Sequence, residues 1–423
     1  MTPANSRVHP IDAASARRGV RDYALAHLGK SFFWVAGDAL TIYILIRYAG
    51  YGPVAAGSLF LAALLWNAIC DVAVGCWADR RGAAGRTLAP VLAVAAPTMG
   101  AAFVASLFLP PRQWPWELFA ALVFRTAFAV FDVPHNAMMA RLSTTPAIGL
   151  DIANLRTIAS GVAALVVGVV AMPLIDRGGE AIALPLVLIL SAVSIVLLLP
   201  FLRIFPRLER LPLSTESRPD FAPAPAPALS FARLCAVATC STVALAALGK
   251  AILHLNLVHN RWATGTVLVM MLGRIAATLA AGPAIAQFGS AGALRVACLI
   301  ATGLILALPF AVAAGEWLPL LVILLLGFAL GVEVIVSWLI LAAIVRSSRI
   351  EMRRGSLRFG LFTMIAKVAA GSGGWLLGWL LARADVPGST QIVMDAGMLW
   401  GLCLAAAFGT LLAAWLARPS PSF

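Results

Sequence analysis

Apolar runs separated by short polar connectors follow one another along almost the whole chain of 423 residues. Each run is about 20 residues long, which is the length that a helix needs to cross the hydrocarbon core of a bilayer. The runs are continuous, whereas the strands of a membrane barrel alternate apolar and polar side chains. The pattern therefore predicts twelve membrane-spanning helices. We expect them at residues 23–48, 53–78, 88–109, 116–140, 152–175, 181–202, 231–258, 264–288, 294–314, 317–345, 357–382 and 392–416.

The composition supports a membrane protein. Hydrophobic residues make up 61% of the chain and charged residues 12%, and the mean hydropathy is +0.94. A soluble protein carries about 25% charged residues, so a chain with half that charge cannot cover a globular surface in water. Because only helices and closed barrels satisfy their backbone in lipid, the predicted fold class is an all-α integral membrane protein. The six cysteines fit no zinc or redox spacing, and we expect neither a metal nor a cofactor.

A polar break between residues 203 and 230 divides the chain into two halves of six predicted helices each. The break is charged and contains a repeated Ala-Pro segment, which is typical of a semi-rigid solvated linker. The predicted organisation is an N-terminal tail, a first bundle, the linker, a second bundle and a C-terminal tail, at residues 1–22, 23–202, 203–230, 231–418 and 419–423.

Arginine supplies most of the net charge of +13. A basic chain could bind nucleic acid, but these arginines lie in short connectors rather than on a soluble domain. The arginine-rich connectors, at residues 7–21, 80–86, 203–218 and 346–358, all fall on one side of the predicted membrane. Connectors of this kind face the cytoplasm. We therefore expect a multi-pass protein of the cell inner membrane with both termini cytoplasmic and no nucleic-acid partner.

Ionisable side chains inside the apolar runs are the candidate functional residues. A charge at the centre of a membrane helix costs at least about 2.5 kcal/mol and by default marks an ion or substrate pathway. The three lysines of the chain, Lys30, Lys250 and Lys367, all fall in predicted spans. So do Asp71 and Asp132, whose side chains are too short to reach the interface. We expect each of these charges to face a cavity or an opposite charge.

Further polar residues share helix faces with these charges, because residues three or four positions apart are neighbours on a helix. Three such sets are His27, Ser31, Trp34 and Asp38 beside Lys30; Asn67 with Asp71; and Arg125, Asp132, His135 and Asn136. Arg156 lies on the fifth predicted span, and Lys367 begins a stripe of glycines that favours close helix packing. The alternatives are structural ion pairs, side chains that reach the interface, and histidines packed in the core.

The connector after the second predicted span carries a recognisable motif. Gly75, Asp79, Arg80, Gly82 and Arg86 occur in the order of the signature loop of the major facilitator superfamily, which this connector resembles. The resemblance implies the twelve-helix major facilitator fold, with two six-helix bundles around a central cavity. It also implies that the loop takes part in conformational gating.

Four stretches resemble a narrower family, the glycoside–pentoside–hexuronide:cation symporters, which form the melibiose permease branch of that superfamily. The stretches are Gly29-Lys30, Trp66-Asn67-Ala68-Ile69-Cys70-Asp71, Asp132-Val133-Pro134 with Arg156 downstream, and Arg358-x-Gly360 followed by Lys367-x-Ala369-x-Gly371. The resemblance implies that Asp71, Asp132 and Lys367 form the cation site, supported by Lys30 and Arg156.

The chain also departs from the pattern of that family. Asn67 replaces the first acid of the cation site, and Ser31 replaces the acid that contacts the sugar. One carboxylate fewer weakens a sodium site, whereas a single buried acid can still carry a proton. We therefore expect the proton as coupling ion, or no coupling ion at all. The lost acid at Ser31 also weakens the case for a galactoside as substrate.

Together these features predict a secondary transporter that moves a small polar or sugar-like solute by alternating access, as a monomer in the bilayer. Asp71, Asp132, Asn67 and Lys367 are the predicted coupling residues. The predicted solute-binding residues are Lys30, Ser31, Trp34, Asp38, Arg156, His135, Asn136 and Trp375. A proton-driven exporter of amphipathic or lipid-like solutes and a non-transporting sensor are the alternatives. We find no phosphate-binding glycine loop, nucleophile elbow or zinc motif, so we do not expect an enzyme.

Overall fold

The computed structural model describes residues 13–108, 113–209, 228–254, 262–315, 317–347, 349–384 and 396–418, and these are helical apart from short turns. The first half contains α1 (Ala13–Arg47), α2 (Pro53–Ala83), α3 (Ala89–Phe108), α4 (Trp114–Leu142), α5 (Pro146–Leu165), the π-helical turn η1 (Val166–Ala171) and α6 (Met172–Glu209). The second half contains α7 (Phe231–His254), α8 (Trp262–Ala314), α9 (Trp317–Arg346), the short α10 (Arg349–Arg353), α11 (Gly355–Ala384) and α12 (Ala396–Leu416).

Two glycines divide the two longest helices. Gly179 in α6 and Gly289 in α8 have φ angles of 64° and 67°, and each separates two helical segments. Glycine occupies this left-handed region without the steric cost that a side chain would add. The 53-residue α8 therefore supplies two spans, and α5, η1 and the start of α6 together supply one.

The prediction of an all-helical membrane protein is confirmed. Ten described helices are long and apolar enough to cross a membrane, with α8 counted once and α4 left out. Helix α8 contains two segments, and α4 is left out because it carries charges such as Glu117, Arg125 and Asp132. Within the described residues, each of the twelve predicted spans corresponds to a helical segment, whereas residues 109, 255–258 and 392–395 of three predicted spans lie outside the described residues.

We expected the linker to begin at residue 203. Helix α6 instead continues to Glu209, so the first seven residues of the predicted linker are helical. The Glu209 carboxylate accepts a 2.9 Å hydrogen bond from the Leu88 amide and one from the Thr87 hydroxyl at the start of α3. A carboxylate at a helix N-terminus satisfies free amides and interacts favourably with the helix dipole. This contact fixes the last turn of α6 to the start of α3.

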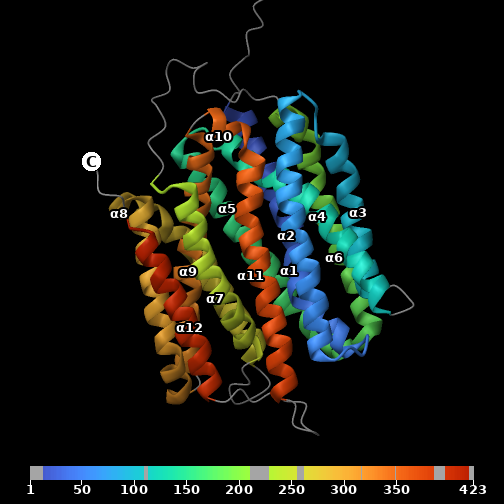
Figure 1. Cartoon of the computed structure of the whole chain (residues 1–423), viewed down its shortest axis with the longest axis vertical. Coiled ribbons are helices and arrows are strands. Elements are labelled where there is room, and N and C mark those ends of the chain that lie inside the picture. The colour runs from blue at the N-terminus through green and yellow to red at the C-terminus, as the bar shows by residue number, and fades with distance from the viewer. Residues whose placement is uncertain are drawn as a thin grey trace, which may run out of the picture.

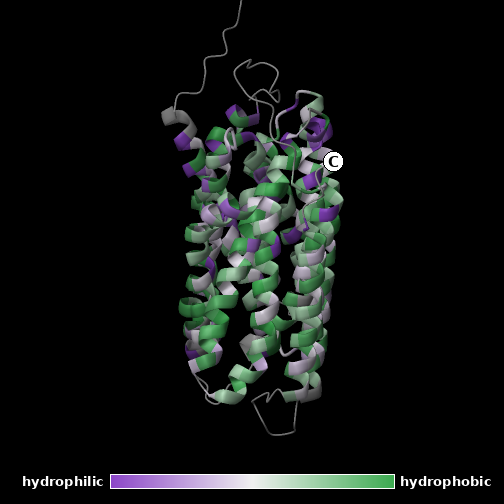
Figure 2. Ribbon diagram, turned by 90° about the vertical axis from the view of Figure 1, so that its left-hand side faces the viewer, coloured by the Kyte–Doolittle hydropathy of each residue, from purple (hydrophilic) through white to green (hydrophobic). Residues whose placement is uncertain are grey.

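The helices run along the long axis of the molecule (Figure 1). In that view α8, α9 and α12 lie on one side and α3, α4 and α6 on the other, and α2 packs against α11 between them. We call the end that carries α10 and the α2–α3 loop the Arg-rich end. Figure 2 shows that hydrophilic residues gather at this end and become sparse toward the opposite end.

Glycines bring α2 and α11 into close contact toward both ends of α11. A Cβ on Gly75 would lie 2.8 Å from the Leu357 Cα, and a Cβ on Gly360 would lie 2.4 Å from the Asp71 carbonyl oxygen. At the opposite end, a Cβ on Gly378 would lie 2.5 Å from a backbone oxygen of α2. Only glycine permits so close an approach, so this side of the bundle interface is closed along its length.

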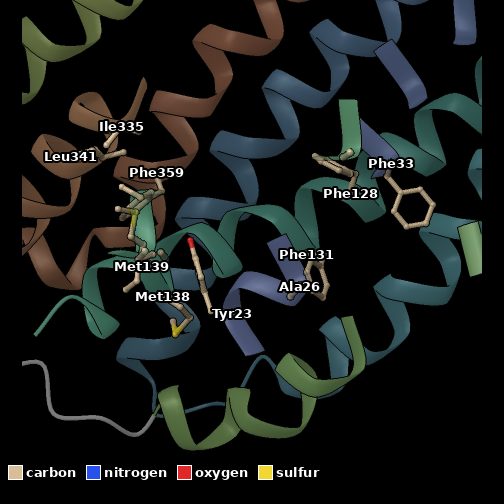
Figure 3. Close-up of a cluster of buried hydrophobic side chains, with 14 of the residues drawn as sticks. Tyr23, Ala26, Phe33, Phe128, Phe131, Met138, Met139, Ile335, Leu341 and Phe359 are labelled. Carbon is tan, nitrogen blue, oxygen red and sulfur yellow. The ribbon is translucent and has the colours of Figure 1, made fainter. Parts of the chain in front are cut away.

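The apolar core also crosses the interface between the two halves. One cluster of buried side chains includes Tyr23, Met138 and Met139 of the first half together with Leu341 and Phe359 of the second (Figure 3). Because Met139 lies in the last turn of α4, this part of the core is at the Arg-rich end. The two halves are therefore packed against each other on both sides of the polar residues described next.

Candidate functional site

Four charged side chains from four helices meet inside the molecule. They are Lys30 of α1, Asp71 of α2, Asp132 of α4 and Lys367 of α11, and their exposed fractions are 4%, 0%, 6% and 2%. The sequence analysis predicted each of them as a candidate residue, without predicting which of them would pair. The structure brings them into one network, which we call the central ion network.

Lys367 joins the second half of the chain to both acids of the first half. Its Nζ donates to the two Asp71 carboxylate oxygens at 2.6 and 2.5 Å and to Asp132 Oδ2 at 3.2 Å. Thr363, one turn earlier on α11, donates its hydroxyl to Asp71 Oδ2 at 2.7 Å. Our sequence analysis did not include Thr363 among the candidates, although its spacing of four residues from Lys367 places both side chains on one face.

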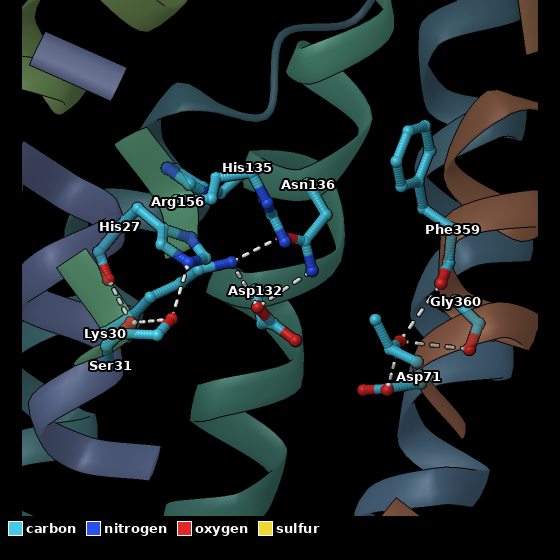
Figure 4. A network of polar contacts seen from close by, with 12 residues as sticks. His27, Lys30, Ser31, Asp71, Asp132, His135, Asn136, Arg156, Phe359 and Gly360 are labelled. Carbon is cyan, nitrogen blue, oxygen red and sulfur yellow. Dashed lines mark hydrogen bonds and ion pairs between the residues drawn. The ribbon is translucent and has the colours of Figure 1, made fainter. Parts of the chain in front are cut away.

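Lys30 connects Asp132 with a cluster of hydrogen bonds inside the first half (Figure 4). Its Nζ donates to Asp132 Oδ1 at 2.6 Å and to Asn136 Oδ1 at 2.5 Å. Asn136 donates its amide to the same Asp132 oxygen at 2.9 Å. Arg156 donates to Asn136 Oδ1 at 2.9 Å and to the Tyr23 hydroxyl at 2.5 Å. A single amide oxygen thus accepts hydrogen bonds from two cations.

Arg156 makes a second contact between the halves. The centre of its guanidinium lies 3.8 Å from the centroid of the Trp338 ring, which belongs to α9. A guanidinium over an indole face is attracted by the ring quadrupole, and burial strengthens the attraction. Neither Trp338 nor Tyr23 was a sequence candidate, because an aromatic residue in an apolar span is indistinguishable from a core residue.

Ser31 and His135 lie beside the central ion network, within the first half. Ser31 donates to the carbonyl of His27 at 2.6 Å, and its Oγ lies 3.3 Å from that of Ser160. His135 is fully buried, stacks on Tyr23 with ring centroids 4.2 Å apart, and has Nε2 3.1 Å from the Tyr23 carbonyl oxygen. His135 therefore packs as part of the aromatic core.

Asn67 links Asp71 to a second polar group on α4. Its amide donates to Asp71 Oδ1 at 3.3 Å and to the backbone carbonyl of Arg125 at 3.2 Å. The carboxylates that act electrostatically on Arg125 are Asp38 and Asp71. Asp38 therefore lies near Arg125, and its carboxylate acts on this guanidinium.

The two tryptophan candidates make other contacts. The Trp34 ring centroid is 5.8 Å from the Arg125 guanidinium. Trp375 is 42% exposed, and its Cα lies against Gly57 of α2, two turns beyond Lys367 on α11.

The predicted gating loop reaches across to α11 at the Arg-rich end. The Asp79 carboxylate accepts hydrogen bonds from the backbone amides of Ser356 and Leu357 at 3.0 and 2.9 Å. A carboxylate in this position caps the first turn of α11 and complements its dipole. Arg80, Gly82 and Arg86 are exposed around this contact, whereas Gly75 is buried against α11.

The central ion network balances its own charge, because Lys30 and Lys367 face Asp71 and Asp132. Removing one partner of a buried ion pair costs about 3–5 kcal/mol, since an uncompensated charge is left in a medium of low polarity. A proton that binds to either carboxylate would remove part of the attraction that holds Lys367. Protonation of Asp71 or Asp132 can therefore weaken the contact that Lys367 makes between the two halves.

Comparison with known proteins identifies the family. A model of the family described as MFS/sugar transport protein matches residues 23–418, nearly the whole chain. The chain belongs to this family. The family consists of transporters of the major facilitator superfamily, so the protein is a membrane transporter and not an enzyme. A search of curated protein sequences finds no match.

Solved structures share the fold at low sequence identity. The human organic anion transporter MFSD10 (TETRAN) has a TM-score of 0.66 and 16% identity, with 95% of this chain and 99% of that chain covered. A bacterial homologue of the iron transporter ferroportin in an outward-facing state has a TM-score of 0.66 and 12% identity, with 95% and 98% covered. A bacterial homologue of the human peptide transporters PepT1 and PepT2 has a TM-score of 0.63 and 14% identity, with 95% and 97% covered. These similarities establish the major facilitator fold.

Proposed function

We propose that this transporter is a proton-coupled symporter that carries a small polar or sugar-like solute by alternating access. The observation that supports the proposal most directly is that Lys367 bonds to Asp71 and Asp132 across the two halves. A proton that neutralises Asp71 leaves Lys367 with fewer charged partners. The contact between α2 and α11 then weakens, and the two halves are freer to move.

Two features favour a proton over sodium. The Lys367 ammonium already lies within hydrogen-bonding distance of three carboxylate oxygens, which is the position that a metal cation would occupy. Asn67 supplies an amide donor to Asp71, and a donor opposes a cation in that place. A buried carboxylate, in contrast, accepts a proton without further ligands.

The residues around Arg156 suit a polar solute. Lys30, Asn136 and Arg156 offer charged donors and amide groups to hydroxyl or carboxylate oxygens. Trp338 lies beside them, with the Arg156 guanidinium over its ring and Phe359 stacked against it, so a sugar ring would stack on this indole only after displacing one of these two partners. We propose Trp338, rather than Trp34 or Trp375, as the stacking residue. The sugar transport family assignment supports this choice of solute class.

We further propose that the Arg-rich end faces the cytoplasm of the inner membrane, following the positive-inside rule, and that the protein works as a monomer. Alkaline phosphatase or reporter fusions to the two ends would test the orientation.

The test of coupling is uptake by proteoliposomes. Purified protein is reconstituted, a proton gradient directed inward is imposed, and a panel of radiolabelled hexoses, pentoses, glycosides and sugar acids is screened. We expect at least one member of the panel to accumulate, a protonophore to abolish accumulation, and Asp71→Asn to remove the dependence on the gradient. Asp151→Asn, an exposed acid of α5, is the matched control and should behave like the wild type.

Uptake that is equal with and without the gradient would refute proton coupling. Accumulation only in inverted vesicles, together with altered tolerance to dyes or detergents in cells, would favour the exporter instead. Ligand binding without any counterflow would favour the sensor.

A further inference from the structure

A second polar site lies inside the first half, between the central ion network and the end opposite the Arg-rich end. Glu117 is in the first turn of α4, where its side chain is 3% exposed, and among the residues that the structure describes neither of its carboxylate oxygens accepts a well-formed hydrogen bond, although the Tyr51 side chain lies near it. Arg125 lies two turns deeper on the same helix, is also 3% exposed, and has an unpartnered Nη1. Two opposite charges with unfilled hydrogen-bonding capacity are thus buried close together.

Glu117 and Arg125 line the same cavity. It has about 20 Å³ of room and is lined by residues of α1, α2, α3 and α4. The remaining polar lining consists of Thr41 and Ser106, and the rest is apolar. A cavity of more than roughly 10–15 Å³ can hold one water, provided that two or more polar partners surround it. This cavity meets both conditions.

Other polar and charged side chains interact with Glu117 and Arg125. Tyr51, in the connector between α1 and α2, has its pKa raised to about 12 by partial burial and by the nearby Glu117 carboxylate. Arg125 in turn is under the electrostatic influence of Asp38 and Asp71. Its backbone carbonyl also shares the Asn67 amide with Asp71. A line of charged and polar groups therefore runs from Tyr51 to the central ion network.

We propose that a single water in this cavity bridges the Glu117 carboxylate to the Arg125 guanidinium, and that Glu117 thereby sets the pH at which Asp71 binds its proton. A charged Glu117 offsets part of the positive charge of Arg125. Without that charge, as in Glu117→Gln, Arg125 would favour the ionised form of Asp71 more strongly, and Asp71 would bind its proton only at lower pH. Glu117 is a positioning residue in this account, because it acts on Asp71 through Arg125.

This inference rests on the proposed function in one respect, namely that Asp71 is the acid that binds the coupling proton. Its test uses the proton itself as probe, so it does not require the solute to be known. Infrared spectra of the protein in vesicles are recorded across a pH series. The difference between the spectra of the wild type and Asp71→Asn isolates the titration of Asp71. The same difference is then measured between Glu117→Gln and the double variant Glu117→Gln with Asp71→Asn.

We expect Glu117→Gln to move the Asp71 midpoint toward lower pH by about one unit or less. Glu117→Asp keeps the charge and should keep the midpoint near its wild-type value, which separates charge from folding. Glu333→Gln removes a buried glutamate from the other half and should leave the midpoint unchanged. An unchanged midpoint in Glu117→Gln, or an equal shift in Glu333→Gln, overturns the proposal.

The water has its own test. A high-resolution experimental map should show one ordered water within hydrogen-bond distance of both Glu117 and Arg125. A dry cavity, or a direct ion pair between the two side chains, would overturn the bridge. If solute uptake turns out to be independent of a proton gradient while the midpoint still shifts, the proposed function fails and the inference about Glu117 stands.

Discussion

The two halves of the molecule bury their charges in different ways. The first half contributes Lys30, Asp71 and Asp132 to the interface between the bundles, and the second contributes Lys367. The second half also has a buried acid, Glu333 of α9, but its described electrostatic partners, Ser241 and Arg274, come from α7 and α8 of the same half. Both arrangements carry the cost of buried charge, but a contact within one half does not change when the halves move.

The same distinction applies inside the central ion network. Lys30 and Asp132 belong to the first half, so a rigid-body movement of the bundles preserves their contact. Lys367 belongs to the second half, so the movement must break or rearrange its bonds to Asp71 and Asp132. In the proposed transport cycle the first half would therefore supply a preorganised acidic site, and Lys367 would supply the contact that changes.

The largest effect is expected from Lys367→Ala. Without the ammonium, Asp71 and Asp132 lose their charged partner from the second half. The free energy of unfolding should fall by about 3–5 kcal/mol, measured in detergent by chemical denaturation, and proton-driven uptake should be lost. In the double variant with Asp71→Ala, stability should recover in part while uptake stays lost. A single variant as stable as the wild type would contradict the importance of the cross-bundle contact.

A smaller loss is expected where α2 and α11 touch. The added methyl group of Gly360→Ala would lie 2.4 Å from the Asp71 carbonyl oxygen, so the helices must separate. We expect a loss of about 1–3 kcal/mol in the free energy of unfolding. Gly401→Ala on α12 is the control, since its methyl group would meet no atom within 4 Å. Equal effects of the two substitutions would show that the close approach does not matter.

Loss of the cap on α11 should cost less again. Asp79→Ala removes the acceptor of the Ser356 and Leu357 amides, and a lost cap costs about 1 kcal/mol. The thermal midpoint should fall slightly, and the Arg-rich end should open more often, which can be followed by cysteine accessibility. Arg86→Ala in the exposed part of the same loop should leave both measurements at their wild-type values.

The smallest effect is expected within the second half, at α10. Two hydrogen bonds from Arg358, of 2.6 and 2.8 Å, hold the pKa of Glu351 below its usual value. The stabilisation is therefore present above the unfolded value of about 4.3 and is lost as the pH falls through the lower folded value. Glu351→Gln should cost less than about 1 kcal/mol at neutral pH. Unfolding curves of the two proteins should converge in acid, and a difference that grows as the pH falls would contradict this.

Most of the fold could be predicted from the pattern of the sequence. The length of an apolar run and the cost of a charge within it are local properties, so the twelve spans and the candidates Lys30, Asp71, Asp132 and Lys367 could be read along the chain. Helix ends were less predictable, since the last turn of α6 contacts the start of α3 through Glu209, and a contact between distant segments is not visible in the local pattern.

The composition of the site depended on tertiary structure. Lys367 and Asp71 are 296 residues apart, and no local pattern states that they form an ion pair. Thr363, Trp338 and Tyr23 look like ordinary residues of apolar helices until neighbouring helices place Asp71 and Arg156 beside them. The sequence by itself determined which segments cross the membrane and which charges are buried there, since both follow from the transfer of residues from water to lipid. Only the packing of the helices decided which of those charges pair across the two halves, because pairing depends on distances between segments that the chain order does not specify.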